Sequence, residues 1–147
     1  MLEEAGAQMT TVSQAPMDLL ASHVVLGEQG TPYIVEDAPA FWQDIMTGAF
    51  KTEGVQRAGT AGYLVAQYTH TQDSPIWELH PHGTDLLYLL SGHLVIELET
   101  PGGNQTVDLS AGRSFLIPQA TWHRLHAPEP SSLLAITWGA GTQFRPA

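Results

Sequence analysis

One short stretch, residues 77–92, holds two imidazoles and two carboxylates within eight positions. Residues i and i+2 of an extended strand point to the same side, so Glu78, His80 and, if the strand continues, His82 are expected on one surface. Asp85 then arrives from the next strand. Neutral imidazoles and carboxylates are the ligands of zinc and of two-histidine, one-carboxylate iron or manganese sites. The first hypothesis is therefore a metal site.

A second stretch, residues 112–126, adds two more histidines. Alternate residues of a strand share a face, so His123 lies with Leu125, whereas His126 lies with Arg124. Because leucine belongs in a core and arginine in water, His123 is the inward candidate and His126 is interpreted as a surface histidine.

The elements that must position these side chains are short apolar runs separated by turn residues, a pattern that begins at residue 62 and holds nearly to the end of the chain. Strands recurring at such spacing are typical of an antiparallel sandwich or barrel. The expected strands cover residues 63–69, 76–80, 86–90, 93–99, 106–109, 114–117, 122–127 and 133–138.

The N-terminal part has a different pattern. Residues 1–20 lack periodicity and are predicted to form a flexible arm, which leaves 21–147 as one barrel domain. Two short β-branched runs, at 23–26 and 32–35, predict strands. Between them and the barrel, Asp37 is a suitable N-cap for a single short helix over 38–46.

Length, composition and charge exclude several classes of function. A chain of 147 residues fits one domain, and the absence of cysteine excludes disulfides, thiolate metal sites and cysteine nucleophiles. Fifteen acidic residues against five basic ones give a formal charge of −10, which repels nucleic acids and anionic membranes. With neither a signal-peptide core nor an apolar run near the ~20 residues that span a bilayer, we expect a cytoplasmic protein.

Together the two stretches resemble the paired motifs of the cupin superfamily. In the first motif, a carboxylate follows a His-x-His pair and is separated from a glycine by six intervening residues, as Asp85 is from Gly92. The second motif is matched position for position by Gly112, Pro118, Ala120 and His123. This resemblance implies an all-β fold, the cupin double-stranded β-helix or jelly-roll barrel, here with one short N-terminal helix.

The first motif departs from the family pattern, because Asp85 stands where the family usually has a glutamate. The histidine pair fits in two registers: either His80 and His82 form it across a shortened gap, or His80 is its second member and Glu78 replaces the first. We favour the second register because it keeps the usual spacing. The candidate metal ligands are Glu78, His80, His82, Asp85 and His123.

Such a set suits a divalent Fe, Mn, Ni or Zn ion. The alternative is a metal-free polar pocket in which buried histidines hydrogen-bond to neighbouring carboxylates.

By resemblance, the chain is expected to bind or act on a small organic molecule inside the barrel, as a metal-dependent dioxygenase or isomerase. One alternative is a non-catalytic small-molecule binding or sensor module. A further alternative is a metal-free cupin of the sugar-epimerase kind, with a histidine base and a tyrosine acid. The resemblance also implies a homodimer.

Overall fold

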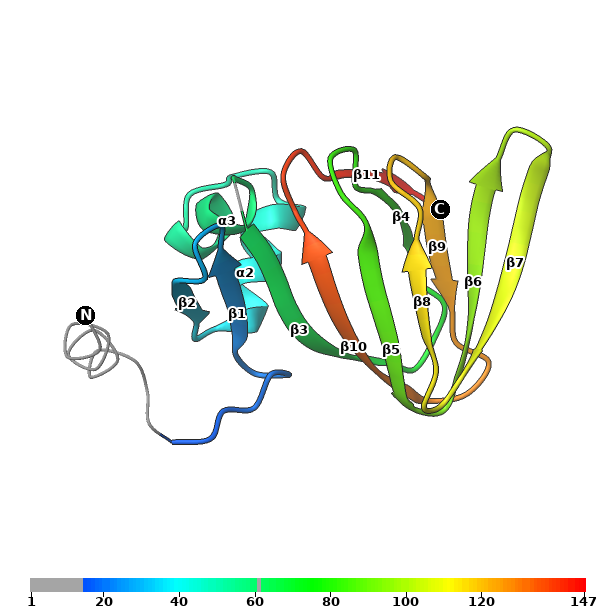
Figure 1. Ribbon diagram of the computed structural model, residues 1–147, viewed down its shortest axis with the longest axis horizontal. Coiled ribbons are helices and arrows are strands. Elements are labelled where there is room, and N and C mark those ends of the chain that lie inside the picture. The colour runs from blue at the N-terminus through cyan, green and yellow to red at the C-terminus, as the bar shows by residue number, and fades with distance from the viewer. Residues whose placement is uncertain (1–14, 61) are drawn as a thin grey trace.

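The computed structural model describes residues 15–60 and 62–147, which fold into two antiparallel sheets facing each other (Figure 1). The first has the order β2 (Pro32–Val35), β1 (His23–Gly27), β3 (Gly62–His70), β10 (Ser131–Trp138), β5 (Asp85–Ser91) and β8 (Ser114–Ile117). The second has the order β11 (Gln143–Pro146), β4 (Ile76–Leu79), β9 (His123–His126), β6 (His93–Thr100) and β7 (Gly103–Ser110). The predicted all-β jelly-roll class is confirmed.

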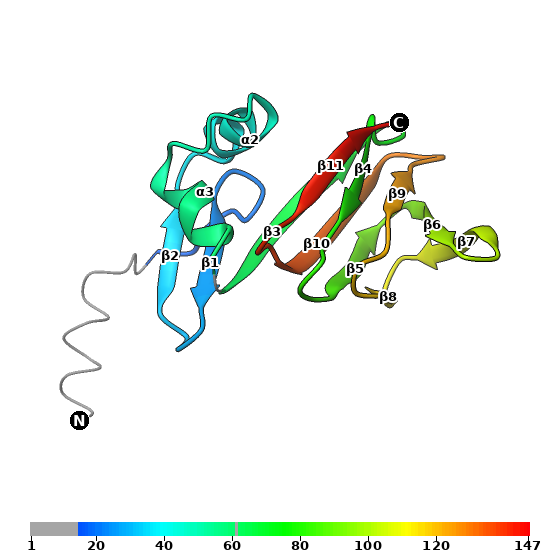
Figure 2. The same cartoon turned by 90° about the horizontal axis from the view of Figure 1, so that it is seen from above.

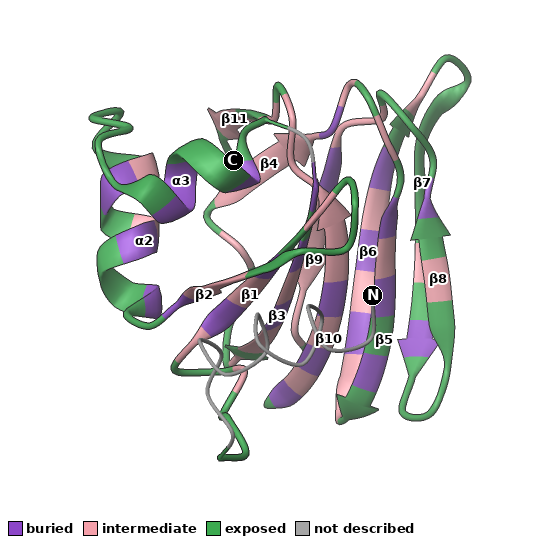
Figure 3. Cartoon of the chain, turned by 60° about the vertical axis from the view of Figure 1, so that its left-hand side comes forward, coloured by how far each residue is buried: buried purple, intermediate pink, exposed green. Residues whose placement is uncertain are grey.

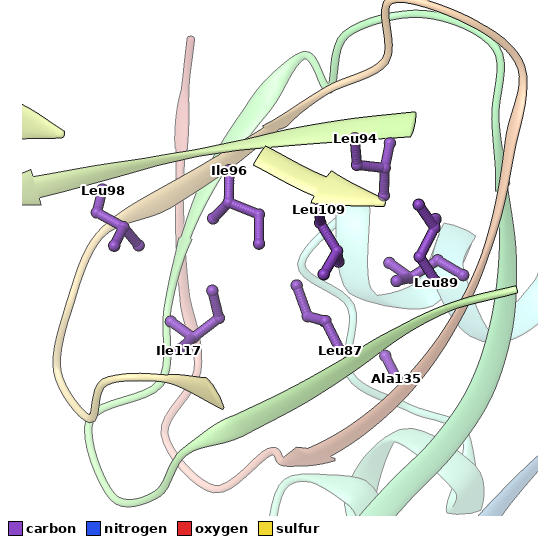
Figure 4. Packing of buried hydrophobic residues seen from close by; sticks show 9 residues of the cluster. Leu87, Leu89, Leu94, Ile96, Leu98, Leu109, Ile117 and Ala135 are labelled. Atoms are coloured by element: carbon purple, nitrogen blue, oxygen red, sulfur yellow. The ribbon is translucent and has the colours of Figure 1, made fainter. Parts of the chain in front are cut away.

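Buried and exposed residues alternate along the central strands, as a two-layer β-fold requires (Figure 3). Leu94, Ile96 and Leu98 of β6 all face inward and are buried, as the alternation in the sequence predicts. They pack against Leu87 and Leu89 of β5 from the opposite sheet (Figure 4). This apolar cluster fills one part of the barrel and holds the two sheets together.

Two helices precede the barrel strands and lie beside β1 and β2 (Figure 2). Helix α2 (Ala38–Met46) is the predicted one, and the Asp37 side chain caps it by accepting a hydrogen bond from Ala40 N at 3.0 Å. Helix α3 (Glu53–Ala58) was not predicted, so the expectation of a single helix is corrected. With six residues, one of them glycine, α3 is too short to show helical periodicity.

A second apolar cluster joins the helices to the first sheet. Phe41 of α2 and Val55 of α3 pack on Val25, Leu64 and Ala66 of strands β1 and β3. The helices are thereby held against one side of the barrel. Among the described residues, no helix is long and apolar enough to cross a membrane.

The link between the helices is organised by one carboxylate, Asp44. It accepts hydrogen bonds from the backbone of Lys51 at 3.0 Å and of Thr52 at 2.9 Å, and a third from the Thr52 hydroxyl. These bonds hold the pKa of the carboxyl below its usual range. Phe50, next to them, has a φ of 51°, a left-handed conformation that is uncommon for residues other than glycine.

The predicted division into an arm over 1–20 and a domain over 21–147 stays a prediction. Residues 1–14 lie outside the described part of the chain. From residue 15 the chain is described, and the Leu19 carbonyl accepts hydrogen bonds from Gln67 N at 3.2 Å and from His23 Nδ1 at 2.9 Å.

His23 is a buried histidine that connects this segment to α2. Its Nδ1 donates to the Leu19 carbonyl, and its Nε2 accepts a hydrogen bond from Trp42 Nε1 at 3.0 Å. Only the neutral imidazole can make both bonds, since a proton on Nε2 would face the indole N–H. Burial lowers the pKa of His23 below 6.5 and outweighs the bond to Leu19.

This pair of hydrogen bonds predicts acid sensitivity. Below pH 6.5, His23 is protonated in the unfolded chain but stays neutral in the folded protein. The contribution of neutral His23 to the free energy of unfolding is therefore complete above that pH and falls as the pH decreases. Chemical denaturation from about pH 7.5 to about pH 5 should show a steeper loss of unfolding free energy for the wild type than for His23→Gln. The control is His93→Gln, which removes a partly exposed histidine of β6. Equal slopes for wild type and His23→Gln would contradict the assignment.

Candidate metal centre

Four of the five predicted ligand residues come together between the two sheets. Glu78 of β4 and His123 of β9 are cross-strand partners in the second sheet, and His80 follows directly after β4. One ligand atom each of Glu78, His80 and His123 lies within 4.8 Å of the other two. Asp85 reaches this group from the opposite side, as the first residue of β5 in the first sheet.

The imidazole Nε2 atoms point at the carboxylates. Asp85 Oδ2 lies 3.3 Å from His80 Nε2 and 3.7 Å from His123 Nε2. Glu78 Oε2 lies 3.7 Å from His123 Nε2. The other oxygen of Asp85 accepts a hydrogen bond from the Thr137 hydroxyl at 2.8 Å, which fixes the orientation of the carboxylate.

The Nδ1 atoms of His80 and His123 each face an oxygen atom that accepts a hydrogen bond from them. His123 Nδ1 lies 3.0 Å from the Thr121 carbonyl, so this nitrogen carries a proton. His80 Nδ1 lies 2.9 Å from the Thr142 hydroxyl, whose own proton is donated to the Gly139 carbonyl at 2.9 Å. The hydroxyl therefore accepts from His80. In their neutral forms both rings direct an Nε2 lone pair into the site, the tautomer that metal ligation requires.

The site suits a cation. Two lone pairs and two carboxylates face one another, and the buried His80 Nε2 has no hydrogen-bond partner. The separations of 3.3 and 3.7 Å between donor atoms are close to the ~3.4 Å between neighbouring ligands of a tetrahedral zinc ion with bonds of about 2.1 Å. A divalent ion held by Glu78, His80 and His123 would give His80 Nε2 the partner that it lacks.

The ionisable groups of the site shift one another's pKa values. Burial raises the pKa of Glu78 to about 7; His80 opposes this rise and Asp85 adds to it. Burial also lowers the pKa of His123. For His80, burial lowers the pKa, but the neighbouring carboxylates of Asp85 and Glu78 outweigh this effect, so the pKa rises.

The loops that carry the two motifs are bonded to each other. Ala120 N donates to the His80 carbonyl at 2.9 Å, and the Gln119 side chain donates to the Pro81 carbonyl at 2.9 Å. Ala120 adopts a φ of 55°, a left-handed conformation that is uncommon for residues other than glycine. Residues forty positions apart in sequence are therefore fixed side by side by the backbone.

The family profile described as "Cupin domain" matches residues 65–138, which is half of the chain and contains both motifs. This chain belongs to the cupin family. No curated protein shows significant sequence similarity to it.

Several solved structures resemble this cupin over about half of its length. A protein with a cupin-2 domain from Shewanella frigidimarina is 21% identical, with 51% of this chain and 69% of that chain covered and a TM-score of 0.45. Bacillus subtilis oxalate decarboxylase, which has Mn(II) centres, is 20% identical, with coverages of 57% and 23% and a TM-score of 0.47. A hydroquinone 1,2-dioxygenase in complex with Cd²⁺ and 4-hydroxybenzonitrile is 21% identical, with coverages of 51% and 56% and a TM-score of 0.44.

The fifth candidate ligand of the cupin, His82, does not join the other four. Its side chain is exposed, and it lies against the backbone of Gly141. His126 points to the outer side of β9, where it bridges Asp73 at 3.0 Å and Glu97 at 2.8 Å. These two carboxylates raise the pKa of His126.

Two threonines that orient the site were not found from the sequence. Thr137 follows the alternation of inward residues on β10, and it is the cross-strand partner of Asp85. Thr137 continues the inward-facing positions of Leu133 and Ala135, and a hydroxyl at that position was a sequence signal that could have identified it. Thr142 lies just before β11, a strand that the sequence analysis did not predict. Nothing in the local pattern indicates that its hydroxyl reaches His80.

The four grouped side chains open into a cavity of about 530 Å³. Most of its wall is apolar: α2 contributes Phe41, Trp42 and Ile45, and the barrel contributes side chains such as Leu64 and Leu133. The volume falls within the range of about 300–1,000 Å³ typical of small-molecule pockets. The cupin thus has a candidate metal centre at the wall of a cavity that can hold an organic molecule.

Proposed function

We propose that this cupin holds one divalent metal ion between Glu78, His80, Asp85 and His123 and binds or transforms a small organic molecule beside it. The observation that carries the proposal is the pair of imidazole lone pairs held toward two carboxylates in a buried site. Iron, manganese, nickel and zinc all suit two imidazoles with carboxylate oxygens.

The chain's own residues have separate tasks in this proposal. A bound divalent ion would supply Lewis-acid polarisation of a substrate oxygen or, for iron or manganese, oxygen chemistry. His80 and His123 keep their lone pairs directed inward through Thr142 and the Thr121 carbonyl. Glu78 supplies a carboxylate beside His123, 3.7 Å from its Nε2. The apolar wall excludes water from the bound molecule.

Metal loading tests the proposal directly. The purified protein, stripped with a chelator and reloaded with each candidate ion, is expected to take up close to one ion per chain by elemental analysis. Its melting temperature should rise, because an ion that binds only the folded state stabilises it. Failure of all four ions to bind at micromolar concentration would leave a metal-free polar pocket and end the proposal.

Enzyme and binding module differ in the fate of the ligand. Soaking the loaded protein with candidate molecules and analysing what is recovered separates turnover from retention of unchanged ligand. Recovery of a product would favour an enzyme of the oxygenase or isomerase type, and recovery of unchanged ligand would favour a binding module. The metal-free sugar-epimerase alternative needs cations for a nucleotide-linked sugar, and Arg124 is the single cationic side chain among the cavity residues described.

We propose that the partner of the chain is a second copy of itself, bound through the outer face of the first sheet. Tyr63, Tyr88, Leu90 and Leu116 are large apolar side chains exposed there. The outward positions of β3, β5, β8 and β10 carry no charged residue, although the chain carries a net charge of −10. Two copies can therefore approach through this face without bringing like charges together.

Light scattering should give twice the chain mass for the wild type and the chain mass for Leu116→Glu. The control is Gln105→Glu, which places the same charge on an exposed position of β7 in the other sheet. A wild type that is monomeric at micromolar concentration would contradict the dimer. The cytoplasmic location and the absence of nucleic-acid or membrane partners stay predictions.

A further inference from the structure

The charge of the cavity lining limits the class of molecule that the cavity can bind. Its carboxylates are Glu78 and Asp85, and its one described cation is Arg124. Arg124 follows His123 on β9, so its side chain leaves the opposite face of the strand, and its Nε donates to the Ser74 carbonyl at 2.8 Å. Apart from the histidines of the centre itself, no cationic side chain among the described lining residues faces the metal centre.

The same balance holds with a metal in place. A divalent ion is neutralised by the two carboxylates, and the neutral imidazoles add no charge. A ligand that carries a negative charge would have to leave water for an apolar cavity without a net positive charge to receive it. A neutral molecule meets no such cost.

Most of the cavity lining away from the metal centre is apolar. Phe41, Trp42 and Ile45 of α2 face the cavity together with Leu133 and Ala135 of β10. Tyr68 also lines it, with its ring edge-on to Trp42 at a centroid distance of 5.6 Å. A rigid apolar body matches these rings, and one oxygen atom matches the polar end.

The rim carries a further sign of ligand contact. Phe50 lines the cavity with 53% of its surface exposed, in the left-handed backbone conformation described above. Met46, also half exposed, lines it as well. Asp44 fixes the loop on which Phe50 stands, through its bonds to Lys51 and Thr52. An exposed aromatic side chain held in a strained conformation at a cavity rim is placed to contact what enters.

We infer that the ligand of this cavity is an uncharged, ring-shaped apolar molecule with a single hydroxyl or carbonyl oxygen directed at Glu78, His80, Asp85 and His123, and that Phe50 contacts its apolar body. The inference names the ligand class of the proposed function and rests on it for the oxygen end alone. The apolar body and the preference for neutral molecules follow from the lining, with or without metal.

The test uses two probes of the same shape, neutral 2-naphthol and anionic 2-naphthoate, titrated calorimetrically into chelator-treated protein and into zinc-loaded protein. We expect 2-naphthol to bind both forms, more tightly with zinc, and 2-naphthoate to bind each form about tenfold or more weakly. Equal or tighter binding of 2-naphthoate would overturn the inference, as would failure of 2-naphthol to bind either form. Binding of 2-naphthol by a protein that takes up no metal would support the inference while the proposed function fails.

Phe50→Gly isolates the contribution of the rim. Glycine adopts a φ of 51° without strain, so this variant removes the ring and leaves the loop conformation available. We expect 2-naphthol affinity to fall several-fold, with the melting temperature unchanged or raised. The control is Leu20→Ala, an exposed apolar residue outside the cavity lining, which should leave the affinity unchanged. Unchanged affinity in Phe50→Gly would remove Phe50 from the inference.

Discussion

The His123→Ala variant should lose its bound metal. His123 lies 3.7 Å from both Glu78 Oε2 and Asp85 Oδ2, so its removal leaves the two carboxylates with one imidazole. Removing a residue that hydrogen-bonds to a metal ligand costs about 10–100-fold in metal affinity. Removing the ligand itself should therefore cost more than about 100-fold. Competition with a chromophoric chelator measures the change.

The chain offers two comparisons for this variant. His82→Ala removes an exposed histidine two positions from His80 and should keep full metal content. Thr142→Val removes the hydroxyl that accepts from His80 Nδ1, and its effect should lie near the 10–100-fold range of an indirect partner. Full metal content in His123→Ala would remove this histidine from the centre. Loss of metal in His82→Ala would favour the register in which His80 and His82 form the pair.

Gly92→Ala should destabilise the fold far more than Gly112→Ala, although both glycines have a left-handed backbone, with φ values of 88° and 82°. A Cβ on Gly92 would lie 2.5 Å from the Pro130 carbonyl oxygen and 2.7 Å from Ser131 Cα. A Cβ on Gly112 meets nothing within 4 Å. The second variant should therefore cost only the left-handed conformation, about 1–2 kcal/mol.

In Gly92→Ala the same conformational cost is joined by displacement of backbone, and the total should reach about 3–5 kcal/mol. Urea denaturation of the two variants beside the wild type measures both values. The size of the difference matters, because it separates close backbone approach from conformational strain. Equal losses would mean that strain alone explains the glycine that ends the first motif.

The sequence was sufficient for the barrel and for the residues that converge in it. Alternation placed Leu94, Ile96 and Leu98 in the core, and motif spacing picked out His80, Asp85 and His123, which the structure brings together. The sequence left the fourth candidate ligand open between Glu78 and His82. In the structure Glu78 lies beside His123, because the register of β4 and β9 pairs them, and this contact joins strands far apart in sequence.

Other features were beyond the reach of local pattern. Helix α3 has six residues, fewer than two helical turns, and β11 has four residues and ends in proline. Neither segment is long enough to show a hydrophobic periodicity in the sequence. The cavity depends on where α2 lies against the barrel, and packing of a helix on a sheet leaves no local signature. Thr142 was missed for the same reason, since its partner His80 stands sixty-two positions away.

The bonds from Ala120 to the His80 carbonyl and from Gln119 to the Pro81 carbonyl join the two halves of the centre through protein atoms alone. Folding of the chain therefore positions the candidate ligand atoms before an ion binds, so binding does not need to order them. Loading and unloading become exchange reactions of a folded protein. Under the proposed function, the ion bound at this site would therefore depend on which metals are available and on their relative affinities.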